Sequence, residues 1–134
     1  MALVRAFRQE LTGDIRLIDA CHTTIQPCAD CRYCLTHPRC CVNDGMMELY
    51  ADIETSDNIV LASPIYYDQL SGPLLSLCSR FQVYYKNPLV TRRLGVFLAA
   101  AGGSSKSIEL AAHTAALIFR QLGARFLGSA ASMH

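Results

Sequence analysis

The stretch NIVLASPIYYDQLSGPL, residues 58–74, combines the signals of a buried strand, a loop and the start of a helix. Residues 58–62, NIVLA, form a nearly continuous apolar run, which is typical of a buried strand in a parallel sheet. SPIYYDQLSGP, residues 63–73, breaks this run, and Pro64 is expected to fix a turn there. A helical pattern then continues through residues 74–85.

The rest of the chain alternates strand and helix patterns in the same way. Helical spacing predicts helices at residues 1–11, 46–54 and 107–122, and apolar runs predict strands at residues 14–19, 92–103 and 125–129. Gly13 and Gly123 are expected to end the first and last of these helices. This alternation predicts an α/β protein, a doubly wound sandwich around a parallel sheet. In such sheets, ligands bind beyond the carboxyl ends of the strands.

Length and charge limit the classes of function. The chain has 134 residues and 51% hydrophobic content, which suffices for one ordinary core, so a single domain is expected. Twelve basic residues against eleven acidic ones give no reason to expect a nucleic acid or an anionic membrane as a partner. The N-terminus carries charges and does not resemble a secretory signal, and the longest apolar run is far shorter than the ~18 residues of a membrane span. We therefore expect a cytoplasmic protein.

Five of the seven cysteines lie in CADCRYCLTHPRCC, residues 28–41. In a reducing compartment this concentration predicts metal binding or redox chemistry rather than disulfides. The spacing C-x2-C-x2-C-x5-C is formed by Cys28, Cys31, Cys34 and Cys40. Its two short gaps let a curled loop direct three thiolates at one bound group. This spacing favours an iron-sulfur cluster over structural zinc, which more often uses two separated C-x2-C pairs. Zinc and thiols without metal are the alternatives.

The remaining polar and sulfur side chains receive simpler interpretations. Cys41 directly follows Cys40 and competes with it as the fourth ligand, whereas Cys21 and Cys78 are expected to be small buried residues. Asp44 is expected to cap the helix that follows it. The four histidines show no ligand or triad spacing and are interpreted as surface or structural residues, and no catalytic acid or base is assigned.

Two loops that follow buried strands are candidates for the ligand-binding edge. Residues 63–72 offer the flat faces and hydroxyls of Tyr66 and Tyr67. The loop AGGSS offers Gly102 and Gly103, which let backbone N-H groups face a ligand, and its serines are expected to cap the next helix. Each loop taken alone is also explained by packing or by an ordinary turn.

Together, the cysteine spacing and SPIYYDQLSGPL, residues 63–74, closely resemble the flavodoxin-like NADPH-dependent FMN reductase superfamily, specifically its iron-sulfur flavoprotein branch. The resemblance covers nearly the whole chain. It implies a [4Fe-4S] cluster on the four cysteines at positions 28, 31, 34 and 40. It also implies contacts with FMN from Pro64, Ile65, Tyr66, Tyr67, Gly102 and Gly103.

The same resemblance implies an activity and partners. The protein would be an FMN-dependent oxidoreductase that relays electrons between FMN and the cluster, with NAD(P)H as an electron donor. Relatives assemble as homodimers or homotetramers in which the cluster of one subunit lies near the flavin of a neighbour. The expected acceptor is a redox partner such as ferredoxin or a small molecule.

The chain departs from the family pattern in three places. Relatives begin with a hydrophobic strand and a loop that binds the FMN phosphate, and they continue into a last helix beyond the fifth strand. Their Asp-Arg pair at the end of the third helix reads Ser79-Arg80 here. The expected fold is thus a flavodoxin-like domain over residues 1–134 that lacks the first strand with its phosphate loop and the last helix, either as a fragment or through a misplaced start. Such a chain would expose unpaired strand edges and bind FMN poorly.

Two other functions compete with the electron relay. One is an NAD(P)H-dependent FMN or quinone reductase whose cysteines carry no cluster. The other is a zinc-stapled, non-enzymatic binding module on a degenerate scaffold. The visible spectrum and the metal content of anaerobically purified protein separate the three: brown with iron and sulfide, yellow without metal, or colourless with zinc.

Overall fold

The computed structural model describes residues 2–101 and 104–132. Its α-helices are α1 (Ala2–Gln9), α2 (Met46–Thr55), α3 (Gly72–Ser79) and α4 (Ser105–Gln121). Its 3-10 helices are η1 (Ala20–His22), η2 (Tyr33–Leu35) and η3 (Arg80–Tyr84). Its strands are β1 (Asn58–Tyr66), β2 (Gln69–Leu70), β3 (Leu94–Ala101) and β4 (Arg125–Ala131). Each of the helices that the sequence predicts is present, with ends shifted by a few residues.

The ends of α4 have clear local causes. Ser104 is the N-cap, and its side chain accepts a hydrogen bond from the backbone N-H of Ser107, so the helix begins before residue 107. The predicted stop at Gly123 is confirmed, because this residue has a φ of +67° just beyond the helix. A Cβ atom there would lie 2.2 Å from the carbonyl oxygen of Leu89, so glycine is required for space as well as for conformation.

The strands form one sheet in the order β2-β1-β3-β4. Strand β3 pairs in parallel with β1 on one side and with β4 on the other, whereas β2 adds two antiparallel residue pairs at the end of β1. The near-continuous apolar sequences of β1 and β3 suit their position in a parallel sheet that is covered by helices. The predicted α/β class with a parallel sheet is confirmed.

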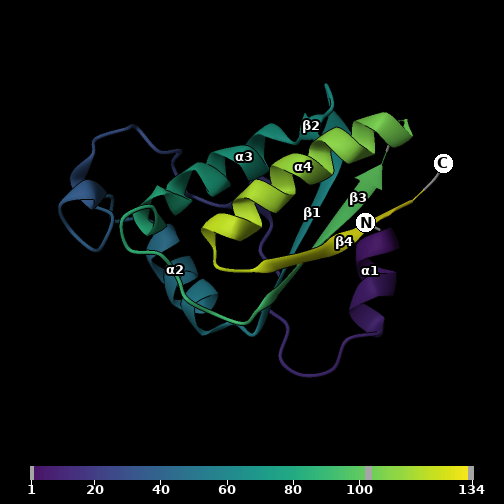
Figure 1. Cartoon of the computed structure of the whole chain (residues 1–134), viewed down its shortest axis with the longest axis horizontal. Helices are drawn as coiled ribbons and strands as arrows, with labels where there is room; N and C mark the ends of the chain where they lie inside the picture. The colour runs from purple at the N-terminus through teal and green to yellow at the C-terminus, as the bar shows by residue number, and fades with distance from the viewer. Residues whose placement is uncertain (1, 102–103, 133–134) are drawn as a thin grey trace.

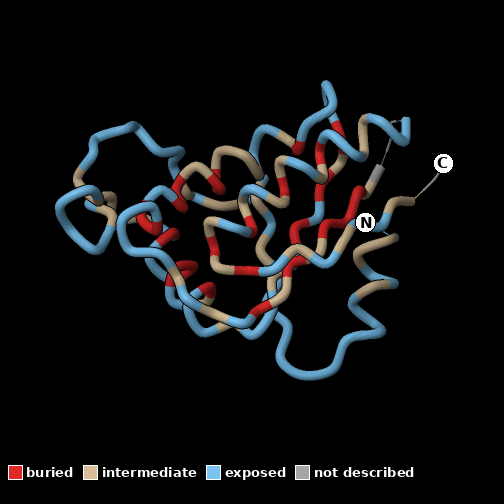
Figure 2. Tube along the Cα trace, viewed as in Figure 1, coloured by how far each residue is buried: buried red, intermediate tan, exposed pale blue. Residues whose placement is uncertain are grey.

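Helices cover the two faces of the sheet unequally. Helix α4 contacts all four strands and crosses over them in Figure 1, while α1 contacts β3. The main core joins Phe97 of β3 with Ala115 and Phe119 of α4, all fully buried. Leu98 is also fully buried, and it points to the opposite face of β3 because side chains alternate along a strand. Figure 2 shows the buried positions concentrated along the strands and the inner sides of the helices.

The predicted strand at residues 14–19 is wrong. This segment has no regular secondary structure and is mostly exposed. It is attached to α2 by Arg16, whose Nε lies 2.9 Å from Asp52 Oδ2 and whose Nη2 lies 3.8 Å from Glu48 Oε2. A strand needs a hydrogen-bonded neighbour, and among the described residues no strand pairs with this segment.

The predicted break of the strand at residue 63 is also wrong. Strand β1 continues through Pro64 to Tyr66, and Pro64 lies at a shift in the pairing with β3, where the absence of a backbone N-H is tolerated. The turn comes later, at Tyr67 and Asp68, which have φ values of 51° and 61°. The polypeptide then returns as β2, so the predicted loop is a tight β-hairpin.

Candidate functional site

The cysteine loop, residues 26–44, is the first candidate site. In Figure 1 it extends away from the sheet, beyond the ends of α2 and α3. Most of it is exposed, but Cys34 and Cys40 are half-buried and pack against the hydrophobic core. The loop therefore lies on the body of the protein and is not a detached arm.

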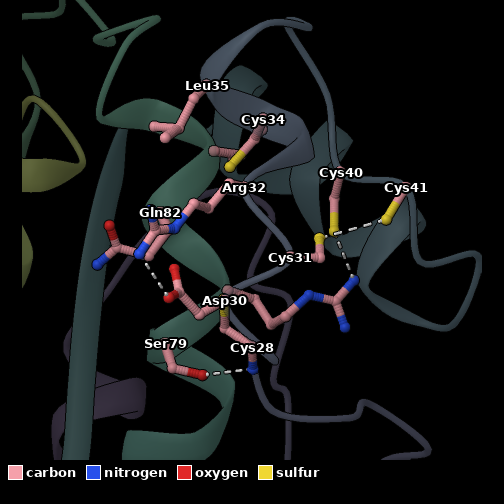
Figure 3. Close-up of a pocket in the computed structure, with 12 residues that line it drawn as sticks. Cys28, Asp30, Cys31, Arg32, Cys34, Leu35, Cys40, Cys41, Ser79 and Gln82 are labelled. Atoms are coloured by element: carbon pink, nitrogen blue, oxygen red, sulfur yellow. Dashed lines mark hydrogen bonds and ion pairs between the residues drawn. The ribbon is translucent and has the colours of Figure 1, made fainter.

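A cavity of about 290 Å³ lies between this loop and the end of α3. Its lining includes the candidate ligands Cys28, Cys31, Cys34 and Cys40, together with Cys41, Ser79 and Arg80. Figure 3 shows the sulfur atoms of Cys31, Cys40 and Cys41 near one another, with Cys34 and Cys28 on other sides of the opening. All four cysteines that the sequence assigned to one site thus line the same cavity.

The thiols differ in their environments. Burial raises the pKa of Cys34, and the negative charges that Cys28, Cys40 and Cys31 would carry raise it further. A backbone hydrogen bond from Tyr33 lowers the pKa of Cys31. The Sγ atoms of Cys31 and Cys41 are 3.5 Å apart. Within residues 2–101 and 104–132, no three His, Cys, Asp or Glu side chains already meet in a geometry that holds a metal ion.

The floor of the cavity is formed by Ser79 and Arg80 at the end of α3. Ser79 Oγ accepts a hydrogen bond of 2.9 Å from the backbone N-H of Cys28. The Arg80 side chain is only 1% exposed, and its Nη1 and Nη2 donate to the two carboxylate oxygens of Asp44 at 2.7 and 3.2 Å. Nη2 also lies 3.4 Å from Cys40 Sγ. Ser79 and Arg80 therefore contact Cys28 and Cys40, the first and the fourth cysteine of the motif.

Asp44 is held on several sides. Its Oδ1 accepts from the backbone N-H of Met46, the first residue of α2, although the N-cap of that helix is Gly45 and not Asp44 as predicted; its Oδ2 accepts from the backbone N-H of Gln26. Burial by itself raises the pKa of Asp44, but the hydrogen bonds from Arg80, Gln26 and Met46 outweigh burial and lower the pKa below its ordinary value. Asp44 is therefore ionised at neutral pH. Because it is the last residue of the cysteine loop and binds Gln26, the first, it holds the two ends of the loop together.

The predictions for the other two cysteines had different outcomes. Cys78 is buried in the core, as expected, and burial raises the pKa of its thiol to about 12. Cys21 is exposed, so its expected burial is wrong. It lies in η1, where its backbone N-H donates to Asp19 Oδ1 and the chain follows the protein surface.

The hairpin after β1 is the second candidate site. Tyr66 and Tyr67 are exposed at its tip, Pro64 is half-buried, and the side chain of Ile65 packs in the core. The tip is fixed to α4, because Ser107 Oγ donates to Asp68 Oδ1 at 2.5 Å. This anchoring places the tyrosines at the carboxyl end of β1.

Strand β3 ends at the same edge of the sheet. Gly102 and Gly103 lie outside the described residues, but Ala101, which precedes them, is paired with Pro64 of β1. The end of β3 therefore lies beside the hairpin. Helix α3 starts just after the hairpin and ends at the cysteine cavity, a length of ~12 Å for its eight residues.

Sequence reasoning treated Ser79-Arg80 only as a departure from a family pattern and missed its contacts. One signal was available: Arg80 is the one charged residue in LLSLCSRFQVYY, residues 74–85. Arginine is almost never fully buried unless it is paired, so a charge inside a segment that packs in the core indicates an ion pair. The partners themselves, in residues 26–44, could not be read from the sequence.

A parallel α/β sheet covered by helices defines a class of proteins whose ligands bind beyond the carboxyl ends of the strands. Within this class, the chain belongs to the NADPH-dependent FMN reductase family, which its sequence matches over residues 1–134. No helix among the described residues combines the length and apolar character needed to cross a membrane.

The curated relatives agree with the branch that the cysteine spacing indicated. An iron-sulfur flavoprotein of Methanocaldococcus jannaschii is 28% identical over 111 residues, which cover 81% of this chain and 56% of the relative. One of Archaeoglobus fulgidus is 32% identical over 65% of this chain and 46% of its own length. The chain thus spans about half the length of the curated relatives it matches. The Trp repressor binding protein of Bacillus subtilis superposes with a TM-score of 0.48 at 17% identity, covering 64% of this chain and 60% of its own.

Proposed function

We propose that this protein is an FMN-dependent oxidoreductase that relays electrons between FMN at the carboxyl edge of the sheet and a [4Fe-4S] cluster in the cysteine cavity. The observation that carries the proposal is the convergence of Cys28, Cys31, Cys34 and Cys40 on one cavity. Membership of the FMN reductase family and the names of the relatives support the same function.

The residues of the cavity fit an anionic, thiolate-bound group. Four sulfur atoms are available, and the volume of about 290 Å³ far exceeds the roughly 30 Å³ that one water occupies in the liquid. The Nε-H of Arg80 is buried without an acceptor among the described residues, and Arg80 lines this cavity. A cluster would use the four thiolates as ligands and would give this N-H and its positive charge a negative neighbour.

When bound, FMN exchanges electron pairs and a cluster exchanges single electrons, so the two together connect partners of both kinds. The chain has three tasks in this scheme. The cysteine loop holds the thiolates, and Ser79 and Arg80 orient the loop. The hairpin presents Tyr66 and Tyr67 to the flavin ring. Because Ile65 is buried, it would approach the flavin through its backbone.

The rest of the flavin site and the partners belong to the same proposal. Gly102 and Gly103 would supply backbone N-H groups beside the hairpin. NAD(P)H is the proposed donor, and ferredoxin or a small molecule is the proposed acceptor. A homodimer or homotetramer would bring the cluster of one subunit near the flavin of another. The cytoplasm suits the protein because free thiols persist in a reducing compartment.

Anaerobic purification, followed by metal analysis and visible spectroscopy, tests the proposal. We expect brown protein with about four irons and four sulfides per chain, and an added flavin spectrum after incubation with FMN. Yellow protein without metal would support a reductase that lacks a cluster. Colourless protein with one zinc per chain would support the binding module, and either of these results would contradict the relay.

A further inference from the structure

A fully buried arginine at the floor of the cysteine cavity is unusual, because arginine is almost never buried without compensation. Arg80 is 2% exposed, although α3 and η3 are otherwise apolar around it. Asp44 supplies a matched carboxylate at 2.7 Å. Beyond Asp44, the two Nη atoms of Arg80 also contact residues of the cysteine loop.

Arg80 connects the two ends of the cysteine loop. Its Nη1 donates at 2.9 Å to the carbonyl oxygen of Gln26, which precedes the first cysteine of the motif. Its Nη2 lies 3.4 Å from the carbonyl oxygen of Val42, which follows the last cysteine. One guanidinium group on η3 thus holds both ends of the loop, and the cysteines between them are oriented relative to α3.

Two further observations direct Arg80 toward the sulfur atoms. Nη2 lies 3.4 Å from Cys40 Sγ, a distance suited to an N-H···S hydrogen bond. Nε is one of two buried side-chain polar atoms that have no hydrogen-bond partner among the described residues, and Arg80 lines the cavity. The contact of Nη2 with Cys40 Sγ places a positively charged donor beside one of the candidate ligand sulfur atoms.

Building on the proposed function, we infer that Arg80 is a positioning residue for the iron-sulfur cluster and raises its reduction potential. Each electron that enters the cavity adds one negative charge, and a nearby guanidinium stabilises that charge. Hydrogen bonds to the ligand sulfur act in the same direction. Cys40 is then the fourth ligand because Arg80 holds its sulfur in the cavity wall, whereas Cys41 contacts Cys31.

The test compares Arg80→Gln and Arg80→Lys with the unmodified full chain. Arg93→Gln is the matched control: Arg93 is also buried, but its Nη1 and Nη2 donate to the carbonyl oxygens of Ile53 and Glu54 at the end of α2, and it does not line the cysteine cavity. Circular dichroism and thermal melting establish which variants fold.

The first readout needs no cluster. Alkylation of the apo chain with iodoacetamide, followed by mass spectrometry, gives the reaction rate of each cysteine. We expect Cys40 to react severalfold faster in both Arg80 variants and at an unchanged rate in Arg93→Gln. If Arg80→Gln does not fold, Arg80→Lys decides this readout, because it keeps the charge but loses the forked geometry. An unchanged Cys40 rate in a folded Arg80 variant would overturn the positioning role.

The second readout uses chains reconstituted anaerobically with iron and sulfide. Arg80→Gln should retain less than half of the iron, and its remaining cluster should have a lower reduction potential. Arg80→Lys should hold intermediate iron at a potential near that of the unmodified chain, since the charge remains. An unchanged potential in Arg80→Gln would overturn the inference but leave the relay standing. Failure of the unmodified chain to take up iron would instead contradict the proposed function.

Discussion

Arg80 and Asp44 form an ion pair with side chains only 1% and 12% exposed, and this pair joins the cysteine loop to η3. Burying two charges costs a large desolvation free energy, which the bidentate geometry and the further hydrogen bonds to Gln26 and Met46 offset. Removing one partner is more harmful than replacing both, because it leaves the other charge buried alone.

This asymmetry gives a prediction with a definite pH dependence. Asp44→Asn should lower the free energy of unfolding of the apo chain by roughly 3 to 5 kcal/mol at pH 7. The pKa of Asp44 is lowered in the folded state, so its contribution is present above the ordinary value of about 3.9 and is lost as the pH falls through the folded pKa. Urea denaturation at pH 7 and pH 3 should show the difference between the two proteins shrinking in acid. A difference independent of pH would contradict this account.

The cysteines make a second prediction at the same scale. Cys31→Ala should abolish cluster assembly, because it removes one of the four proposed ligands that line the cavity. Cys78→Ala is the control, since its thiol lies in the core and should not affect iron content. Iron analysis after anaerobic reconstitution measures both. Equal losses would exclude the triplet as the site, and a large loss in Cys41→Ala would favour Cys41 over Cys40.

The hairpin of β1 and β2 is an element whose turn has a backbone conformation that its residues disfavour. Tyr67 and Asp68 both have positive φ, where Asn-Gly would be the common choice. Strained backbone that persists is often found at ligand sites. The exposed tyrosines at this turn are therefore better explained by a binding partner than by the needs of the turn itself.

We therefore expect Tyr66→Ala to weaken FMN binding about tenfold, since a lost aromatic contact of roughly 1.4 kcal/mol corresponds to one decade of affinity. Tyr85→Ala is the control, because Tyr85 is equally exposed but lies beyond η3 and away from the hairpin. Fluorescence titration with FMN measures both affinities. Unchanged binding by Tyr66→Ala would indicate that this side chain has no part in the flavin site.

Close packing between β3 and α4 gives a prediction about the core. A Cβ atom on Gly95 would lie 2.4 Å from the ring of Phe119, which is completely buried and cannot move aside. Gly95→Ala should lower the free energy of unfolding by about 1 to 3 kcal/mol through overpacking. Gly72→Ala is the matched control, because nothing lies within 4 Å of the position of its Cβ. Thermal melting of the two variants should separate them clearly.

At the scale of the whole molecule, strand β1 is incompletely paired. Strand β2 covers only the last two residues of β1, so among the described residues no strand pairs with residues 58–64 on the side away from β3. Val60 of β1 is 39% exposed. Unpaired backbone groups beside apolar side chains favour pairing with another chain.

We expect the chain to self-associate through this edge in a concentration-dependent manner. Val60→Lys should shift the population toward monomer, because a charged side chain on an edge strand opposes edge pairing. Leu110→Lys on α4 is the control, since its side chain is similarly exposed but belongs to a helix and not to the unpaired strand. Light scattering coupled to size exclusion over a range of concentrations gives the masses. A strictly monomeric unmodified chain would contradict this prediction.

The sequence by itself determined the features whose signals are local. The class of fold follows from runs such as residues 58–62, the cap and stop of α4 follow from single residues, and the cysteine spacing grouped four residues that line one cavity. Such signals are local because the side-chain periodicity of a helix or strand, and the capping of its terminal backbone groups, depend on nearby residues wherever the element packs.

Only the tertiary structure decided the features that depend on partners distant in sequence. Residues 14–19 have a strand-like pattern but pair with no strand among the described residues, and Arg16 attaches them to α2 instead. Arg80 looks like an isolated charge until the loop 36 or more residues away supplies its acceptors. A hydrogen bond or an ion pair needs two groups at one place, and neither group's own sequence neighbourhood specifies where the other will be.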